Sequence, residues 1–268
     1  MMSTVAKPRE VKRFGALYVA EYRFRNMMKF KALIVMVSVG NPFLYLLSIG
    51  VGVGALIDAN NLIDGVPYLT FLAPALLANA AIGGGMDETV FPTMQGFNWG
   101  KLFYGMNSTP LTGNQIALGV FLAAMARVVF LVTVYWAILY LFGALESPNS
   151  WLAIPTAVLA GACFAAMMLA IAGKMVNEDL FFTFISRFVI VPLFLFSGTF
   201  FPLSSMPIFL QWIGWISPLW HATELGRFLT YGREISTQMV LVHILFLSVI
   251  LIVGLFFALR IYTKRLAK

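Results

Sequence analysis

Apolar residues gather in six long runs, and the segments between them hold most of the charged and turn-forming residues. The runs cover residues 32–57, 66–85, 116–142, 151–173, 180–201 and 240–261. Each contains about 20 residues or more, the length that crosses the hydrocarbon core of a bilayer. The pattern predicts an all-α integral membrane protein with six transmembrane helices.

The positions of the basic residues predict the orientation of the chain. They gather before the first run and after the last: Lys7, Arg9, Lys12, Arg13, Arg23, Arg25, Lys29 and Lys31, then Arg260, Lys264, Arg265 and Lys268. Cytoplasmic flanks carry the excess of Lys and Arg, so both termini are expected in the cytoplasm, as an even number of spans also requires. The protein is therefore expected to be a multi-pass protein of the cell (cytoplasmic or inner) membrane.

Composition leaves room for one domain. The chain has 268 residues, of which 60% are hydrophobic and 11% charged, and its mean hydropathy is +0.88. Soluble domains carry roughly a quarter charged residues and usually need about 100 residues or more. We expect a single transmembrane domain over 1–268, with a cytoplasmic or interfacial N-terminal helix at 1–31, a six-span core at 32–262 and a cytoplasmic tail at 263–268.

The segment before the first run has its own pattern. Apolar residues recur at Val11, Phe14, Tyr18 and Tyr22 among basic residues. Two interpretations are open: an amphipathic helix in the cytoplasmic interface, or a charged anchor for the first span. The first run has no small-residue cleavage site after a short core, so we expect it to remain as a span.

Several kinds of site are excluded by residue type. The single cysteine, Cys163, allows no intrachain disulfide and no zinc site built on several thiolates. No nucleotide-binding glycine loop, HExxH or GxSxG motif occurs, and only His221 and His243 are available as imidazoles. We expect no catalytic residues, no metal and no cofactor on this chain. Its net charge of +7 lies beside apolar runs and suits anionic lipid headgroups rather than nucleic acid.

Small residues mark close helix contacts. Gly50 and Gly54 form a small-xxx-small pair in the first run, and Gly83 to Gly85 close the second. A potassium-filter interpretation of the first group fails, because threonine and tyrosine are missing at the expected places.

One cation lies deep in an apolar run. Arg127 stands about a dozen residues into the third run, near mid-bilayer, where its charge needs a partner or water. Asp87 and Glu88, at the inner end of the second run, are the candidate partners. The sequence leaves open a functional role or a structural ion pair.

The inner segment 91–119 is rich in aromatic residues outside any run. Phe97, Trp99, Phe103 and Tyr104 fit a short amphipathic helix over 97–106 that stops before Pro110. The aromatic side chains rest on the bilayer interface, or they fill a groove on a cytoplasmic partner.

The outer segment 202–238 places charged residues beside tryptophans. His221, Glu224 and Arg227 follow at spacing three and share one face if the segment is helical; an exposed Glu224–Arg227 pair would stabilise little. Trp212 and Trp215, with Trp220 and Trp151, are typical of an interfacial aromatic belt.

Two stretches carry a resemblance to a known family. Residues 193–227, LFLFSGTFFPLSSMPIFLQWIGWISPLWHATELGR, and residues 108–119, STPLTGNQIALG, resemble the membrane subunits of type-2 ABC exporters. The resemblance is strongest to the branch that includes nodulation-factor and lipo-oligosaccharide exporters, and it extends over nearly the whole chain. Two departures stand out: Ser217-Pro218 replaces the commoner Asn-Pro, and Lys101 is the only basic residue in a segment that is often richer in them.

The resemblance implies a permease that forms a homodimer and pairs with two copies of a cytoplasmic ATPase subunit, which binds ATP and Mg. It implies an ATPase-coupling helix with Phe97, Trp99, Lys101, Phe103 and Tyr104. It also implies outer re-entrant helices between spans five and six that form an exit gate, with Phe201, Pro202, Pro207, Trp212, Trp215, Pro218, Glu224 and Arg227.

An amphipathic or lipid-linked cargo, such as a glycolipid or polysaccharide precursor, follows from the same resemblance. Aromatic residues of the first and fifth runs, Phe43, Tyr45, Phe194 and Phe196, are candidates for the translocation path, although such residues are more often lipid-facing or core. The alternatives are efflux of a drug or lipophile, a membrane enzyme acting on lipid through Asp87, Glu88 or Glu224, and an ion channel or scaffolding protein.

Overall fold

The computed structural model describes residues 13–58, 62–176 and 184–267. These residues fold almost entirely into helices, and no β-strand occurs within the three ranges. The longer helices are α1 (Gly15–Met28), α2 (Lys31–Leu46), α4 (Tyr68–Met94), α6 (Gly113–Leu141), α7 (Ala153–Lys174), α11 (Pro218–Tyr231) and α12 (Thr237–Leu266). The shorter ones are α3 (Gly54–Asp58), α5 (Leu102–Asn107), α9 (Val191–Phe196) and α10 (Ile208–Trp215).

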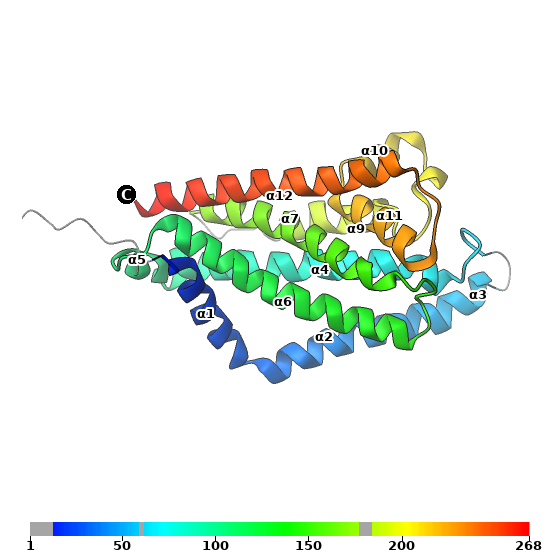
Figure 1. Ribbon diagram of the computed structural model, residues 1–268, viewed down its shortest axis with the longest axis horizontal. Helices are drawn as coiled ribbons and strands as arrows, with labels where there is room; N and C mark the ends of the chain where they lie inside the picture. The colour runs from blue at the N-terminus through cyan, green and yellow to red at the C-terminus, as the bar shows by residue number, and fades with distance from the viewer. Residues whose placement is uncertain (1–12, 59–61, 177–183, 268) are drawn as a thin grey trace, which may run out of the picture.

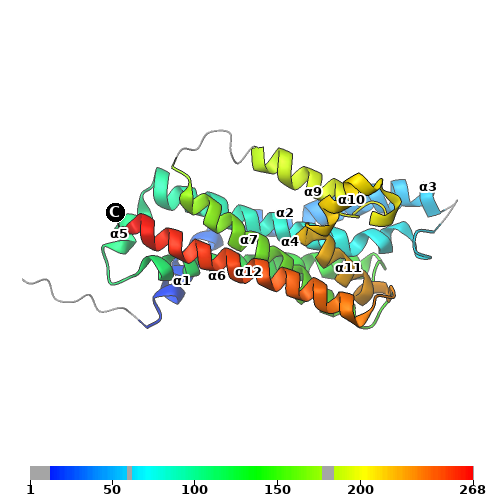
Figure 2. The ribbon, with the colours of Figure 1, turned by 90° about the horizontal axis from the view of Figure 1, so that it is seen from above.

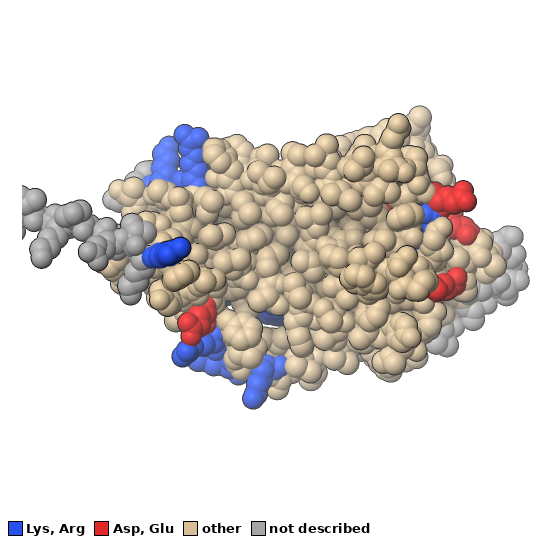
Figure 3. All heavy atoms as spheres, viewed as in Figure 1, with Lys and Arg blue, Asp and Glu red and all other residues tan. Residues whose placement is uncertain are grey.

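The long helices α4, α6, α7 and α12 lie side by side along the longest axis of the molecule (Figures 1 and 2). The N-terminal helix α1, the short α5 and the C-terminus lie at one end of this bundle. Helices α3, α10 and α11 lie at the opposite end. We call these the basic end and the acidic end, because Lys and Arg gather at the first and Asp and Glu at the second, with few charges between them (Figure 3).

Five helical stretches are long and apolar enough to cross a membrane: Lys31–Gly50, Tyr68–Trp99, Gly113–Leu141, Ser150–Lys174 and Thr237–Leu266. They coincide with five of the six predicted runs, and the chain is a multi-pass membrane protein. The remaining predicted span, 180–201, begins on residues outside the described ranges. Its described apolar helix, Arg187–Phe196, is shorter than a span needs, and the six-span count stays a prediction.

Helix ends follow the local sequence. Thr112 caps α6 by accepting a hydrogen bond from the backbone N–H of Gln115, whose side chain accepts one from the N–H of Thr112 in return. Ser236 caps α12 with a single hydrogen bond, which its side chain accepts from the backbone N–H of Met239. Ser217 caps α11 ahead of Pro218, and serine and asparagine are both good caps. The departure from Asn-Pro therefore preserves the start of this helix.

Helices α4 and α7 touch through backbone rather than side chains. A Cβ atom added at Gly85 would lie 2.6 Å from the carbonyl oxygen of Gly161, and one added at Gly161 would lie 2.7 Å from that of Ala81. The predicted close packing at the end of the second run is thus found, at Gly85. In the first run, a Cβ atom added at Gly50 would lie 3.1 Å from the side chain of Leu69.

The N-terminal segment forms a helix, α1, that packs on α6. Val19 is buried, and a Cβ atom at Gly119 would lie 2.5 Å from its side chain. Tyr18 and Tyr22 of α1 are exposed, as is Phe14 immediately before it. The contact with α6 makes α1 part of the helix bundle and not only a charged anchor for the first span. Its position in the membrane interface stays a prediction.

We expect Gly85→Ala to destabilise the protein by about 1–3 kcal/mol, since its methyl group would push α4 away from α7. Gly83→Ala on the same helix is the matched control, because nothing lies within 4 Å of its Cβ position. The measurement is thermal unfolding of the detergent-purified protein. Equal transition temperatures for the two variants would contradict the α4–α7 contact.

Candidate functional site

The inner segment after α4 contains two helical turns rather than one helix. Residues Gln95–Trp99 continue α4 as a π-helix, and α5 begins at Leu102. Between them, Lys101 adopts a left-handed conformation with φ 50°. The prediction of one helix over 97–106 was wrong here, because this left-handed turn separates two helices.

The aromatic residues of the inner segment divide into a buried and an exposed pair. Phe97 and Phe103 are each 2% exposed and meet edge to face, with ring centroids 5.0 Å apart. Both pack on Tyr262 of α12, at 4.8 and 5.6 Å. The expectation that all four rings are available for docking was therefore wrong for Phe97 and Phe103. Trp99 and Tyr104 are 53% and 40% exposed and remain available.

Polar contacts fix the inner segment to the end of α12. The hydroxyl groups of Thr93 and Tyr262 lie 2.6 Å apart, and Asn107 donates to the carbonyl oxygen of Leu266 at 2.9 Å. Arg265 donates to the side-chain oxygen of Asn98 at 2.5 Å. Tyr262 and Arg265 were not among the predicted residues, since only their places in an apolar run and a basic tail were visible in the sequence.

Arg127 pairs with Glu88, one of its two predicted partners. Glu88 is 7% exposed and accepts a hydrogen bond from Arg127, while Arg23 of α1 approaches its other oxygen at 3.9 Å. Asp87 is exposed and has no ion pair among the described residues. A cavity of about 540 Å³ opens beside this cluster, lined by Arg23, Asp87, Glu88, Phe91, Pro92, Gln95, Trp99 and Arg127. The approach of Arg23 depends on the packing of α1 on α6, which the sequence does not reveal.

The spacing of Glu224 and Arg227 correctly predicted a shared helical face, but the pair is buried rather than exposed. Arg227 is fully buried and donates to Glu224 at 2.9 Å and to the carbonyl oxygen of Gly198 at 2.7 Å. Its guanidinium also lies 3.8 Å from the ring centre of Phe71 in α4. Arg233 forms a second ion pair with Glu224, in which a guanidinium nitrogen lies 2.8 Å from a carboxylate oxygen. Arg227 therefore joins α4, α11 and the turn after α9.

The two histidines lie against each other. His221 Nδ1 and His243 Nδ1 are 2.7 Å apart, and His221 Nε2 is 3.0 Å from the carbonyl oxygen of Trp215. A carbonyl only accepts, so His221 carries its proton on Nε2, and its Nδ1 accepts from the Nδ1–H of His243. Burial is the main cause that lowers the pKa of His221 to about 4. His221 is thus neutral at pH 7, and its contact with His243 joins α11 to α12.

The other predicted residues of the outer segment lie along short helices. Pro202 precedes a 3₁₀ turn at Leu203–Ser205, and Pro207 precedes α10. Trp212 and Trp215 are 54% and 49% exposed. Phe201 is 37% exposed, at the start of this region. Their roles as gate residues stay a prediction.

Two of the four predicted path residues line one cavity. Its volume is about 240 Å³, and its walls come from α2, α4, α6 and α9: Asn41, Pro42, Tyr45, Leu76, Asn79, Ala80, Tyr135 and Phe194. Phe43 instead packs edge to face on Phe142, and Phe196 is not in the lining. The lining combines aromatic rings with amide and hydroxyl groups. We call it the α2–α9 cavity.

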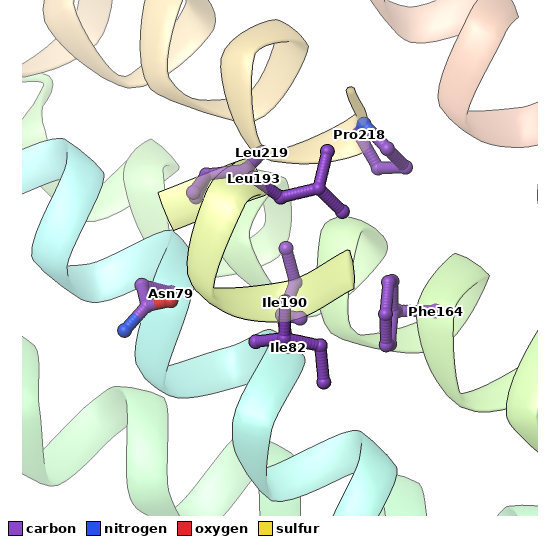
Figure 4. A pocket seen from close by; sticks show the side chains of 7 residues that line it. All are labelled: Asn79, Ile82, Phe164, Ile190, Leu193, Pro218 and Leu219. Atoms are coloured by element: carbon purple, nitrogen blue, oxygen red, sulfur yellow. The ribbon is translucent and has the colours of Figure 1, made fainter. Parts of the chain in front are cut away.

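A second, much smaller cavity adjoins Asn79 (Figure 4). Its volume is about 10 Å³, and it lies among Asn79, Ile82, Phe164, Ile190, Leu193, Pro218 and Leu219. This space admits about one water-sized probe. Its lining comes from α4, α7, α9, α11 and the π-helical turn Ser186–Ile190 before α9.

Comparison with known proteins gives one family and a consistent set of relatives. The family model described as "ABC-2 type transporter" matches residues 16–231. Nodulation protein J of Sinorhizobium fredii (strain NBRC 101917 / NGR234) is 28% identical over 213 residues, which cover 78% of this chain and 79% of the relative. Nodulation protein J of Rhizobium leguminosarum bv. viciae is 26% identical over 257 residues, covering 95% and 96%. The resemblance predicted from residues 193–227 is confirmed.

We expect Glu224→Gln to lower stability by about 3–5 kcal/mol, because Arg227 would keep its charge in a buried site without a carboxylate. Glu234→Gln is the matched control, since Glu234 is exposed and has no ion pair within the described part of the chain. Thermal unfolding in detergent measures both. A Glu224→Gln protein as stable as the control would contradict the structural role of the buried pair.

We also expect stability to fall as the pH is lowered from about 6.5 to about 4. An unfolded histidine takes up a proton near pH 6.5, whereas the buried His221 does so near pH 4, so acid favours the unfolded chain between these values by at most about 3 kcal/mol. His243 and Glu224 are the titratable groups that face it.

The pH test compares unfolding temperatures of the wild type and His221→Gln across this range. Carboxylates titrate in both proteins, so the difference between the two curves isolates the histidine. Parallel curves would show that the imidazole contributes nothing to the acid sensitivity.

Proposed function

The chain belongs to the ABC-2 type transporter family, and on that premise we propose that it is the membrane permease of an ATP-driven exporter. Family membership makes it a transport subunit rather than an enzyme. In the proposed assembly, two copies of the chain form a homodimer with two copies of a cytoplasmic ATPase subunit. The ATPase binds ATP and Mg, and the permease supplies the path through the membrane.

The α2–α9 cavity is the observation that carries this proposal. Tyr45 of α2, Asn79 of α4 and Tyr135 of α6 offer hydrogen-bonding groups, and Phe194 of α9 offers an apolar surface. A mixed lining of this kind suits a molecule that is itself part polar and part apolar. The separate small cavity beside Asn79 lies among side chains of α4, α7, α9 and α11, and in the proposed transport cycle these helices separate as cargo passes outward.

The exposed face of the inner segment is the proposed contact with the ATPase. Trp99, Lys101 and Tyr104 are exposed there, while Phe97 and Phe103 are buried beneath them. The segment continues α4 and is hydrogen-bonded to α12, so a push on it is delivered to both helices. This arrangement supports a coupling role in which closure of the ATPase pair rocks the spans.

The distribution of charge supports the proposed orientation. The basic end holds both the described beginning and the described end of the chain, and the acidic end carries α10 and α11 (Figures 1 and 3). The positive-inside rule then assigns the basic end to the cytoplasm and the outer segment to the exit side of the cell membrane.

The proposed cargo is amphipathic or lipid-linked, such as a glycolipid or polysaccharide precursor. The resemblance of residues 193–227 and 108–119 to the lipo-oligosaccharide exporter branch supports this class, the relatives named above are nodulation proteins, and efflux of a drug or lipophile is the alternative. A lipid-modifying enzyme has weaker support, because Glu88 and Glu224 are each engaged by arginines and are not positioned as an acid–base pair.

We expect Trp99→Ala/Tyr104→Ala to lose most of the co-purifying ATPase and of ATP-dependent transport into inverted vesicles, while the permease stays folded. The reason is the loss of two exposed rings from the proposed contact. Trp151→Ala/Tyr140→Ala removes the same two residue types, also exposed, at the acidic end, and serves as the matched control. Phe103→Ala, in contrast, should destabilise the permease itself by about 3–5 kcal/mol.

The same purification tests the function as a whole. The tagged chain is isolated from its native membrane, and its protein partners and bound lipids are identified by mass spectrometry. Recovery of an ABC ATPase and of ATP-dependent export supports the proposal. Full export by the isolated chain without any ATPase would overturn it.

A further inference from the structure

A groove runs along the outer surface of α7 and α12, away from the α2–α9 cavity. Its middle part is a cavity of about 440 Å³ between side chains such as Ile171, Val253 and Phe257, and Lys174 is its only charged lining residue. A second cavity of about 830 Å³ shares Lys174, Phe257 and Ile261 and continues to the ends of both helices. We call the two together the α7–α12 groove.

Glycines lie at the contact between the two helices that form the groove. Gly254 of α12 packs on Ala166, and Gly173 of α7 packs on the ring of Tyr262; a Cβ atom added to either glycine would lie about 3 Å from that neighbour. Each glycine lines one of the two cavities. The two helices approach closely at these points, and the groove runs along the seam between them.

The groove ends in three cations. Lys174 is the last residue of α7, and Lys264 and Arg265 are in the last turn of α12. No carboxylate lines either cavity among the described residues, and none of the ion pairs formed there involves these three. Arg265 donates to neutral oxygens, those of Gly173, Met175 and Asn98. Within residues 13–58, 62–176 and 184–267, then, no carboxylate pairs with Arg265 or with either lysine.

The dimensions match one leaflet of a bilayer. From Val249 to Ile261 the apolar part of α12 rises about 18 Å, at roughly 1.5 Å per residue, slightly more than half of a hydrocarbon core of about 30 Å. The cations stand at the basic end, where headgroups of that leaflet lie. An apolar channel as long as one leaflet with a cationic end is complementary to a single anionic amphiphile.

We infer that the α7–α12 groove binds an anionic phospholipid of the surrounding leaflet, with one acyl chain along α7 and α12 and the phosphate at Lys174 and Lys264. Arg265 adds charge while holding the end of α7. This lipid is a resident ligand rather than cargo, since the groove is separate from the α2–α9 cavity. The inference goes beyond the proposed function.

The headgroup position gives the lipid a second contact. Tyr104 of α5 lines the same cavity as Lys174 and Lys264, and Arg265 lies 4.1 Å from the ring centre of Phe97. A bound headgroup therefore touches the inner segment as well as both helices. We expect it to stabilise that segment in the position in which Trp99 is exposed.

The test uses the full-length protein in detergent and native mass spectrometry. Phosphatidylglycerol and phosphatidylcholine with the same acyl chains are the lipid probes, and sn-glycerol 3-phosphate is the headgroup probe without chains. Wild-type protein should retain phosphatidylglycerol over phosphatidylcholine and should not retain the glycerol phosphate. Equal retention of the two lipids, or binding of the glycerol phosphate as strong as that of the lipid, would overturn the proposal.

Two variants locate the site. Lys174→Gln/Lys264→Gln should weaken retention of phosphatidylglycerol about 30-fold, as expected for two lysines at a headgroup. Val253→Trp should block the acyl channel and lower retention of both lipids, since Val253 is exposed and lines the groove.

The control is Lys29→Gln/Lys31→Gln, which removes the same charge from exposed positions between α1 and α2. If this control loses as much phosphatidylglycerol as the groove variant, the attraction is to net charge alone and the site is refuted. Wild-type retention by the Lys174→Gln/Lys264→Gln protein would refute it as well. Thermal unfolding verifies that each variant is folded. Lys174 and Lys264 are exposed, so the Lys174→Gln/Lys264→Gln protein still tests the site if the Val253→Trp protein does not fold.

Discussion

The backbone contact between α4 and α7 is the constraint on which the rest of the bundle depends. In a bilayer, side chains gain little by leaving apolar lipid for an apolar protein interior, so helices associate through tight packing and polar contacts. Gly85 and Gly161 permit such packing, because carbonyl groups occupy the space that larger residues would fill. Helix α4 also packs against α6 and α11, and α7 against α12. The positions of α6, α11 and α12 therefore depend on this one contact.

Polar contacts then fix the two ends of α4 in different ways. At the basic end, Glu88 draws together α1 and α6 through two arginines, and Thr93 bonds to α12. At the acidic end, the ring of Phe71 lies under the buried guanidinium of Arg227. Buried charges of this kind contribute more to the uniqueness of an arrangement than to net stability, because desolvation offsets much of their attraction. The tight apolar middle sets how close the helices lie, and the charged ends set which helices meet.

Hydrophobic runs gave the membrane class and five of the helical stretches directly, since length and polarity are properties of contiguous residues. The spacing of Glu224 and Arg227 predicted that they share a helical face. The need of a buried cation for a nearby carboxylate predicted Glu88 as one of two candidate partners of Arg127. What the sequence did not give depends on residues far apart in the chain. The burial of Phe97 and Phe103 requires Tyr262, more than 150 residues away, and the contact of His221 with His243 requires α11 to turn back against α12. The break at Lys101 depends on a left-handed backbone conformation that lysine seldom adopts, so the residue type did not predict it.

The length of α12 has a mechanical consequence. Its 30 residues rise about 45 Å, well beyond a hydrocarbon core of about 30 Å, so the helix must tilt or extend into the headgroup layers on both sides. Packing against α7 and α11 sets the tilt of α12. Tyr262 and Leu266 attach the end of this helix to the inner segment, so the inner segment is held at the depth that the length and tilt of α12 give to that end. The depth of the inner segment relative to the bilayer is therefore set by a helix that lies far away in the chain.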